Sequence, residues 1–512
     1  MLVKTYGCAV YGINAIKVTV EVNMGIGINF FMVGLPDSAV KESQQRIDAA
    51  LKNNGYKIPG KTITVNMAPA DIKKEGSAYD LTIAIGILAA SGQMLSHKAG
   101  DYIIMGELAL DGELRPIKGV LPIAIKAQEE GFKGIILPFA NAREAAVVNG
   151  LEVYGVENIK QVIDFFNDAI ALNKVSIDIE EEFLCKLTQA EYDFSEVKGQ
   201  ENIKRALEIA AAGGHNVILI GPPGAGKTML SKRLPSILPP LTMQEALETT
   251  KIQSVAGKMG KNTGLVTQRP FRNPHHTISD VALVGGGSNP QPGEISLAHN
   301  GVLFLDELPE FKRTALEVMR QPLEDRVVTI ARAKFSVEYP ASFMLVASMN
   351  PCPCGFYNHP EKDCVCSSGV VQKYLNKISG PLLDRIDIHI EVTPVPFSEL
   401  SKSKPSEKSS DIRERVIRAR EVQQARYVGR EGIYCNAQMR SKDLQKICVL
   451  DEAGNALLKT AMERLGLSAR AYDRILKVAR TIADMDTSEN ILPIHVAEAI
   501  QYRSLDRDNW AG

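Results

Sequence analysis

The sequence predicts an α/β protein of several domains, and three observations lead to this fold class. The chain has 512 residues, which is too long for one hydrophobic core, so two to four domains are expected. Strand-like and helix-like segments alternate in the first third of the chain, and an apolar strand near residue 220 runs directly into a glycine-rich loop and a helix. The last fifth has helical spacing of apolar residues without strand signals, so a helical domain is expected there.

The overall charge and composition exclude several classes of protein. Lysine and arginine number 59 against 60 for aspartate and glutamate, so any nucleic-acid surface must be a local patch. The sequence has no signal-peptide pattern at Met1 and no run of about 18 apolar residues, so we expect a soluble, cytoplasmic protein with no membrane partner. Eight cysteines in a chain of this length do not make a disulfide scaffold.

Patterns along the chain predict five segments. Alternating apolar residues predict a strand at 16–22, and helical spacing predicts helices at 36–54 and 78–90, which together indicate a compact α/β domain. Two polar stretches farther along, one acidic and one rich in serine and lysine, indicate connections. The predicted segments are a first domain at 1–172, a linker at 173–192, an α/β core at 193–397, a flexible connection at 398–410 and a helical domain at 411–512.

A phosphate loop is the strongest functional signal. The apolar run 217–220 ends in GPPGAGKT, a full match to the pattern in which glycines let backbone N–H groups turn onto nucleotide phosphates. Lys227 is then expected to reach the β- and γ-phosphates of ATP, and Thr228 to hold Mg²⁺. The expected nucleotide-binding residues are Gly221, Pro222, Pro223, Gly224, Ala225, Gly226, Lys227 and Thr228.

Two carboxylates follow a second apolar strand. Residues 302–305 are apolar and lead into Asp306 and Glu307. Paired with the phosphate loop, this pattern predicts that Asp306 supports the Mg²⁺ shell and that Glu307 orients and polarises the attacking water. The sequence therefore predicts hydrolysis of the nucleotide as well as its binding.

Three polar residues farther along the chain are candidates for the same reaction. Asn350 follows another apolar strand and could hydrogen-bond the γ-phosphate or the lytic water, although an Asn-Pro pair alone indicates only a turn. Arg385 could stabilise transition-state charge on the nucleotide of a neighbouring subunit, or form a surface ion pair with Asp384 or Asp387. Arg470 opens a predicted helix and is suited to sense nucleotide.

The first domain resembles the proteolytic domain of Lon-type proteases. The resemblance rests on three stretches: KEGSAYDL at 74–81, GELALDG at 106–112 and RPIKG at 115–119. It implies an α+β, ribosomal S5 domain 2-like fold, in a family that uses a Ser/Lys dyad. The matching positions hold Ala78 and Leu121, so we expect a scaffold or interaction domain without protease activity. Ser77 and Lys118 lie near those positions and leave residual protease chemistry as the alternative.

The phosphate loop and its partner residues resemble the AAA+ superfamily, which implies a helical lid after the α/β core. Three stretches are similar to its magnesium-chelatase-like branch: FRNPHH at 271–276, the glycine-rich loop 285–293 and LPEF at 308–311. With the Lon-like domain and NPCPCG at 350–355, the chain is identified as a member of the YifB/ComM-type family. That resemblance implies a hexameric ATPase that acts as a DNA branch-migration helicase in recombination and in the integration of transforming DNA.

Two stretches are candidates for contact with DNA. Residues 327–339 predict a hairpin with Arg332 and Lys334 at its tip. The resemblance implies that such a hairpin projects into the pore of the ring, where two cations per subunit would track phosphates; solvated surface charges are the alternative. His275 and His276 lie in a predicted inserted loop, where they either contact substrate or stabilise a turn.

Four of the cysteines are clustered. Cys352 and Cys354 form one C-x-C pair, and Cys364 and Cys366 form another. Four thiolates could hold a tetrahedral Zn²⁺ and fasten a loop, although C-x-x-C pairs are the commoner zinc pattern. Free thiols are the alternative.

Three functions remain open from the sequence. The leading one is an ATP-driven, ring-forming homo-oligomer that remodels branched or single-stranded DNA. The alternatives are a magnesium-chelatase-type ATPase subunit for metal insertion and a protease- or chaperone-like AAA+ module. The Lon-like domain and the cysteine pairs favour the first, because the resembled chelatase subunit is not built with them.

Overall fold

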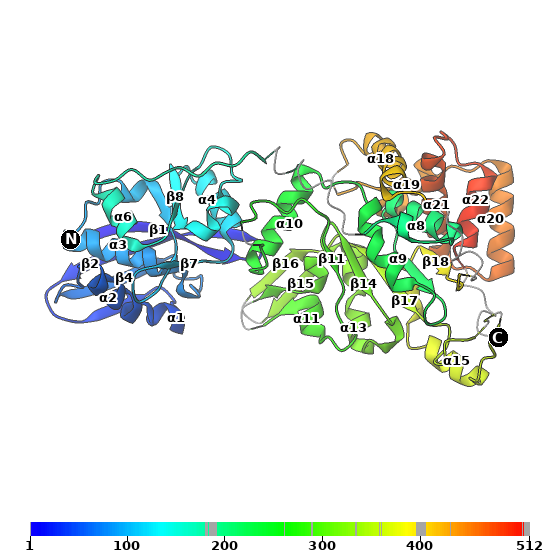
Figure 1. The fold of residues 1–512 in the computed structure, drawn as a ribbon, viewed down its shortest axis with the longest axis horizontal. Helices are drawn as coiled ribbons and strands as arrows, with labels where there is room; N and C mark the ends of the chain where they lie inside the picture. Colours follow the sequence, from blue (N-terminus) through cyan, green and yellow to red (C-terminus); the bar gives the residue numbers. More distant parts are fainter. Residues whose placement is uncertain are drawn as a thin grey trace. The chain divides into compact units, whose positions relative to one another are not determined.

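Two structural units divide the chain, and each is assembled from segments that are far apart in the sequence (Figure 1). The computed structural model describes residues 2–179, 183, 192–260, 262–287, 290–332, 335–357, 359, 361–395, 406–430, 432–503 and 505. Unit 1 comprises Met1–Lys186, Thr242–Thr267 and Ala331–Tyr339. Unit 2 comprises Leu187–Leu241, Gln268–Ile330 and Pro340–Gly512.

A seven-stranded mixed sheet in the order β3-β4-β2-β1-β5-β8-β9 forms the centre of unit 1. In β2 the side chains of Val18, Val20 and Val22 are fully buried, which confirms the strand predicted from their alternation. The strands are β1 Leu2–Tyr11, β2 Asn14–Gly25, β3 Phe30–Val33, β4 Thr62–Ala68, β5 Tyr102–Ile104, β8 Gly134–Pro138 and β9 Glu152–Val156, with a separate short pair β6 Glu107–Leu108 and β7 Leu114–Arg115.

The helices of unit 1 follow the apolar patterns of the sequence. The prediction at 36–54 corresponds to two helices, α1 and α2, and the prediction at 78–90 to α3 after one short 3₁₀ turn. Eleven residues of α3 are buried, because this helix packs on β1 and β2 and is apolar on all sides. The helices are α1 Ser38–Lys41, α2 Ser43–Asn53, α3 Asp80–Ser91, α4 Val120–Glu129, α5 Ala142–Ala145 and α6 Ile159–Phe166.

Unit 1 also contains a helix that the chain supplies much later in the sequence. This helix, α10 (Met243–Val255), packs against α4. The buried carboxylate of Glu144 accepts hydrogen bonds from the backbone N–H of Leu121, at 2.9 Å, and from the hydroxyl of Ser254. The backbone N–H of Gly119 donates to the carbonyl oxygen of Ser254 at 3.1 Å. The end of α10 is therefore fixed to the start of α4 by hydrogen bonds.

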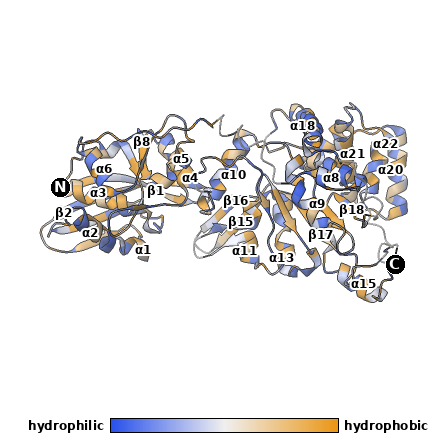
Figure 2. Ribbon diagram, in the orientation of Figure 1, coloured by the Kyte–Doolittle hydropathy of each residue, from blue (hydrophilic) through white to orange (hydrophobic). Residues whose placement is uncertain are grey.

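Unit 2 contains a parallel five-stranded sheet in the order β11-β14-β17-β10-β18. Every residue of β10, β14 and β17 is buried, and the ribbon of β14, found from its label in Figure 1, is mostly hydrophobic in Figure 2. Burial on both faces is typical of a parallel sheet covered by helices. The strands are β10 Val217–Ile220, β11 Phe271–Arg272, β14 Val302–Leu305, β17 Met344–Met349 and β18 Ile388–Glu391, with a small pair β12 Gly285–Gly286 and β13 Gln291–Pro292.

Helices surround this sheet and form all the regular elements after it. From residue 406 onward, the described residues form helices and one isolated bridge between Leu450 and Ile491. The hairpin strands β15 (Val327–Arg332) and β16 (Phe335–Pro340) run across the division between the units. The helices of unit 2 are α8 Glu201–Gly213, α9 Lys227–Arg233, α11 Asp280–Val284, α12 Glu294–Leu297, α13 Arg313–Val318, α14 Arg320–Asp325, α15 Ser368–Leu375, α16 Gly380–Leu383, α18 Ser409–Arg426, α19 Ser441–Ile447, α20 Glu452–Leu465, α21 Ala469–Met485 and α22 Pro493–Gln501.

None of the helices in the described part of the chain combines the length and the hydrophobicity needed to cross a lipid bilayer.

Candidate functional site

The phosphate loop leaves the carboxyl end of β10 in a conformation that requires glycine. A Cβ at Gly221 would lie 2.2 Å from the carbonyl oxygen of Val392, so no larger residue fits there. Gly224 and Gly226 have φ angles of 78° and 91°, which L side chains rarely adopt. The residues of the predicted motif thus form a tight turn that enters α9 at Lys227.

The ammonium group of Lys227 is folded back onto this loop. It donates hydrogen bonds to the carbonyl oxygens of Gly221, at 2.7 Å, and Pro222, at 2.9 Å. It also donates to Oδ1 of Asn350 at 3.1 Å, so two residues that the sequence proposed separately lie in one place. Burial lowers the pKa of Lys227, and the nearby carboxylate charges, Asp306 first, oppose that shift.

Asp306 lies beside the hydroxyl group of Thr228. Thr228 donates to Oδ2 of Asp306 at 2.8 Å, and Ser348 donates to Oδ1 of the same carboxylate. Sequence reasoning missed Ser348, although its position at the end of a central strand, two residues before Asn350, was a usable signal. The oxygens of Thr228 and Asp306 are hard ligands of the kind that Mg²⁺ prefers, so this pair fits the ion.

Glu307 follows Asp306 but points elsewhere. Its backbone is left-handed, with φ of 55°, and its side chain is 58% exposed. Its carboxylate lies 3.8 Å from Nδ1 of His276, and the rings of His276 and His275 lie 4.1 Å apart. A solvent-facing carboxylate beside the Mg²⁺ ligands is able to orient a water molecule. Of the two histidines left open by the sequence, His276 thus belongs to the neighbourhood of Glu307.

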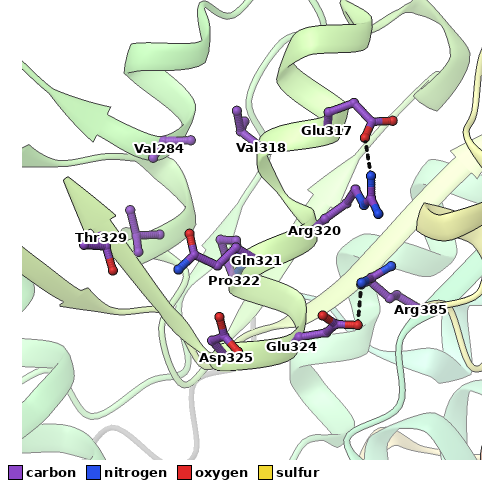
Figure 3. Close-up of a pocket in the computed structure, with 11 residues that line it drawn as sticks. Val284, Glu317, Val318, Arg320, Gln321, Pro322, Glu324, Asp325, Thr329 and Arg385 are labelled. Atoms are coloured by element: carbon purple, nitrogen blue, oxygen red, sulfur yellow. Dashed lines mark hydrogen bonds and ion pairs between the residues drawn. The ribbon is translucent and has the colours of Figure 1, made fainter. Parts of the chain in front are cut away.

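Arg385 is buried beside a polar cavity of about 540 Å³ (Figure 3). Its guanidinium pairs with the carboxylate of Glu324 and donates to the carbonyl oxygen of Pro381. Its Nε has no hydrogen-bond partner among the described residues. In the same view Arg320 pairs with Glu317 at 2.8 Å across the rim of the cavity. The aspartate pairings that the sequence offered as an alternative for Arg385 are replaced by the pairing with Glu324, which sequence reasoning missed.

Arg385 lies at the amino ends of the sheet strands, whereas the phosphate loop lies at their carboxyl ends. In the parallel pairing of β10 with β18, Ile388 is opposite Val217 and Glu391 is opposite Ile220. The segment before Ile388 is therefore at the amino ends of the strands, whereas the phosphate loop follows their carboxyl ends. A single chain does not bring Arg385 to its own phosphate loop.

Arg470 lies on the same side as Arg385. It occupies the first turn of α21, is 61% exposed and pairs with Asp384 at 3.1 Å. One turn later Arg474 pairs with Asp387 at 2.9 Å. Burial favours the neutral acid, but Arg474 and His215 outweigh burial and hold the pKa of Asp387 well below its usual range. Helix α21 thus carries two arginines that bind the aspartates on either side of Arg385.

The residues near the former dyad positions of unit 1 do not meet. Ser77 donates its hydroxyl hydrogen bond to the carboxylate of Glu107. Lys118 is exposed and packs along Gly257, where a Cβ would lie 2.6 Å from its Cε. Leu121 is fully buried. These described residues contain no serine activated by a lysine.

The four clustered cysteines converge. Their sulfur atoms all lie within 4.8 Å of one another, and Cys352 is buried whereas the other three are partly exposed. Hydrogen bonds from the loop, the Phe356 backbone first, lower the pKa of Cys354 to about 6. At Cys364 and Cys366, backbone hydrogen bonds are outweighed by burial and the neighbouring cysteines, which raise the pKa. A lowered pKa favours the thiolate, which is the form that binds metal ions.

The candidate DNA residues lie partly outside the described structure. Lys334 and the side chain of Arg332 are outside the described residues. Farther along the hairpin, the carbonyl oxygen of Ser336 accepts a hydrogen bond from the hydroxyl of Tyr11 at 3.0 Å within unit 1.

Comparisons with protein-family models match three parts of this chain. A model described as magnesium chelatase, subunit ChlI, matches residues 193–400. A model of subunit ChlI of Mg-chelatase matches residues 18–141, and a model of the ChlI C-terminal region matches residues 406–503.

Comparisons with individual proteins match nearly the full chain. The competence protein ComM of Haemophilus influenzae is 44% identical over 504 residues, covering 98% of this chain and 97% of that protein. The protein YifB of Escherichia coli is 44% identical over 508 residues, covering 98% and 96%. Lon protease 2 of Bacillus subtilis is 33% identical over 159 residues, covering 28% of this chain and 27% of that protease.

Proposed function

Because the chain belongs to the YifB/ComM-type, magnesium-chelatase-like family, we propose that it is an ATP-driven, ring-forming motor that remodels DNA. Its reaction is hydrolysis of Mg²⁺–ATP, coupled to branch migration of DNA during recombination and the integration of transforming DNA. The name of the competence protein ComM supports the link to transformation. A motor that integrates transforming DNA acts where the chromosome is, so our proposal includes a cytoplasmic location.

One observation carries the ATPase proposal. At the ends of three adjacent parallel strands, Lys227 is hydrogen-bonded to Asn350, and Thr228, the next residue, is hydrogen-bonded to Asp306. Such a set of one cation, one hydroxyl, one carboxylate and one amide fits a triphosphate with its Mg²⁺. Bound Mg²⁺ would neutralise phosphate charge at this site.

The residues of the chain then have separate roles. Lys227 exchanges its bonds to the loop carbonyls for bonds to the β- and γ-phosphates, and Asn350 moves with it to the γ-phosphate or the lytic water. Thr228 and Asp306 are the residues that would hold Mg²⁺, and the hydrogen bond from Ser348 keeps the Asp306 carboxylate in place. Glu307 orients the attacking water and takes up its proton.

A ring of identical subunits, which we propose to be a hexamer, completes the reaction. Arg385 and Arg470 lie at the amino edge of the sheet, opposite the phosphate loop, which supports a role at the nucleotide of an adjacent subunit. An arginine supplied in this way stabilises the charge that develops on the transferred phosphoryl group. The helices after residue 411 act as the lid of this assembly, and the Lon-like domain at 1–172 acts as an S5-like scaffold without protease activity.

Contact with DNA is assigned to the hairpin formed by β15 and β16. Arg332 and Lys334, repeated around the ring, would bind phosphates without reading base sequence. The substrates are branched or single-stranded DNA. Replacing both residues by alanine is expected to weaken salt-sensitive DNA binding and to leave ATP hydrolysis without DNA nearly intact.

Metal insertion into a tetrapyrrole is the second candidate, because the matching family models carry magnesium chelatase names. A protease is a weaker candidate, since Ser77 pairs with Glu107 instead of a lysine.

The deciding experiment measures ATP hydrolysis and strand movement on forked, four-way-junction and linear DNA. The wild-type chain is expected to hydrolyse ATP faster with branched DNA and to move the branch. Glu307→Gln should bind ATP but neither hydrolyse it nor move the branch. If no DNA stimulates hydrolysis and no branch moves, the DNA-motor proposal is wrong. The next test is then whether the other subunits of a magnesium chelatase stimulate ATP hydrolysis.

A further inference from the structure

The cysteine cluster has the geometry of a metal site. Cys352 lies 3.3 Å from Cys354 and 3.7 Å from Cys364 in sulfur-to-sulfur distance, and Cys354 lies 3.5 Å from Cys364. Four thiolates about 2.3 Å from a tetrahedral Zn²⁺ are about 3.8 Å apart, so these sulfurs need to move only slightly to bind the ion. Closed sets of four cysteines are typical of structural zinc sites.

The segment that carries the cluster has little else to hold it. Between Cys352 and Ser367 the described residues form turns and bends but neither helix nor strand. Most of them are exposed or partly exposed, so little apolar burial fixes the loop. A metal ion bound by both ends of the segment would supply the missing cross-link.

The same segment rests on the phosphate loop. Gly355, directly after Cys354, has φ of 86°, and a Cβ at this position would lie 2.5 Å from Cδ and 2.9 Å from Cγ of Pro223. The backbone of the cysteine segment is therefore in direct contact with the proline ring in the middle of the GPPGAGKT motif. A glycine is required for this approach on grounds of both space and backbone conformation.

A second connection runs through the strand that precedes the cluster. Asn350 accepts a hydrogen bond from Lys227 at 3.1 Å, and Cys352, two residues later, is fully buried. Displacement of Cys352 would move the backbone that carries Asn350. The segment 350–355, which carries Cys352 and Cys354, thus contacts the phosphate loop at Lys227 through Asn350 and at Pro223 through Gly355.

We propose that Cys352, Cys354, Cys364 and Cys366 bind one structural Zn²⁺ that holds the phosphate loop in the shape required for ATP. This inference rests on the proposed nucleotide site and adds a metal requirement to it. Zinc acts here as a cross-link. It holds Gly355 in contact with Pro223, and by binding Cys352 it fixes the backbone that carries Asn350. ATP affinity therefore depends on zinc, although zinc takes no part in the hydrolysis step.

The first measurement is the zinc content of the full chain purified without chelator. About one equivalent per chain is expected for the wild type, and Cys364→Ser/Cys366→Ser should contain almost none. Asp363→Asn is the matched control, because this residue lies between the two pairs of ligands and should keep its zinc. Less than about a tenth of an equivalent in the wild type would overturn the metal site.

The second measurement is the affinity for a fluorescent ATP analogue with Mg²⁺ in excess. Treatment with a zinc-selective chelator is expected to weaken binding by at least about tenfold, and added Zn²⁺ should restore the wild type but not the double variant. Gly355→Ala should keep its zinc and still bind nucleotide more weakly, because the new methyl group displaces Pro223.

The possible outcomes separate this inference from the proposed function. A zinc-free chain that binds the analogue as tightly as the zinc-loaded chain would overturn the coupling. A zinc-loaded wild type that binds no nucleotide would instead contradict the ATPase proposal, and the zinc measurement would still decide the metal site.

Discussion

At the scale of single residues, the charged groups of unit 2 are arranged in two sets at opposite ends of one sheet. At the carboxyl end Lys227 pairs with Asn350, and Asp306 accepts hydrogen bonds from Thr228 and Ser348. Arg385 and its neighbours satisfy one another at the amino end, with Glu324 as the partner of Arg385. In the proposed ATPase, each set exchanges a partner within the chain for nucleotide, so we expect these partners to influence nucleotide affinity.

Glu324 is expected to restrain Arg385 until a second subunit arrives. Arg385 is only 5% exposed in the single chain, and its pairing with Glu324 must break before it reaches a neighbouring nucleotide. Glu324 itself is half-exposed, so the pairing is worth no more than about 1 kcal/mol. Glu324→Gln should therefore raise ATP hydrolysis at low protein concentration by about two- to fivefold, with little change at saturating concentration.

The measurement is the rate of ATP hydrolysis as a function of subunit concentration. Asp325→Asn is the control, since Asp325 lines the same cavity beside Glu324. A lower maximal rate in Glu324→Gln, with the same concentration dependence as the wild type, would instead mean that Glu324 orients Arg385 productively.

Asp387 is expected to make unit 2 sensitive to acid. Its pKa is held well below its usual range, so its contribution to stability is complete above the unfolded pKa, near 3.9, and is lost as pH falls through the lower folded pKa. Asp387 is 1% exposed, and removing one partner of a buried pair costs about 3–5 kcal/mol. Asp387→Asn should therefore lower the unfolding midpoint strongly at pH 7, and the difference from wild type should shrink below about pH 4.

Denaturant unfolding at several pH values tests this prediction. Asp384→Asn is the comparison, because its partner Arg470 is mostly exposed and that pairing is worth about 1 kcal/mol at most. A difference between Asp387→Asn and wild type that stays constant from pH 7 to pH 3 would contradict the assigned charge state.

At the scale of elements, the hydrophobic pattern predicted strands that alternate between buried and partly exposed residues and strands that are buried throughout. The alternation at 16–22 predicted part of β2, and the apolar runs before Gly221 and Asp306 predicted the central strands β10 and β14. Because parallel strands end at a common edge, the side chains that follow them could also be grouped from the sequence. The confirmed part of the fold comes from these local patterns.

Periodicity could not reveal contacts between distant segments. Helix α10 carries no apolar stripe that would mark a packing face, and nothing in its sequence indicates that it packs on α4. In the same way, the sequence before β18 offered Asp384 and Asp387 as partners for Arg385, whereas the folded chain provides Glu324 from α14. Ion pairs between long side chains depend on tertiary distances, and no spacing rule along one segment predicts those distances.

The attachment of α10 is expected to depend on one buried carboxylate. Glu144→Ala would leave the backbone N–H of Leu121 and the hydroxyl of Ser254 without their acceptor, which costs about 1–3 kcal/mol. Hydrogen exchange in Met243–Val255 should become faster, with little change in β10 or β17. Glu129→Ala, on the exposed side of α4, is the control and should leave exchange unchanged. Unchanged exchange in Glu144→Ala would show that apolar packing alone holds the helix.

At the scale of the whole molecule, the sequence predicted consecutive domains, whereas the compact units are interleaved. Linkers were inferred from local polarity and charge, which mark exposed chain. The segments Thr242–Thr267 and Ala331–Tyr339 carry no such mark at their ends and nevertheless belong to unit 1. Unit membership is a property of long-range packing and was therefore beyond the reach of composition.

The interleaving has a consequence for modularity. The chain crosses between the units after residues 186, 241, 267, 330 and 339, so no single cut in the gene releases either unit intact. A fragment that starts after the first crossing would expose the side of α10 that packs on α4, and a fragment that ends there would leave α4 without α10. Any transplant of unit 1 onto another protein therefore has to carry three separate stretches of coding sequence.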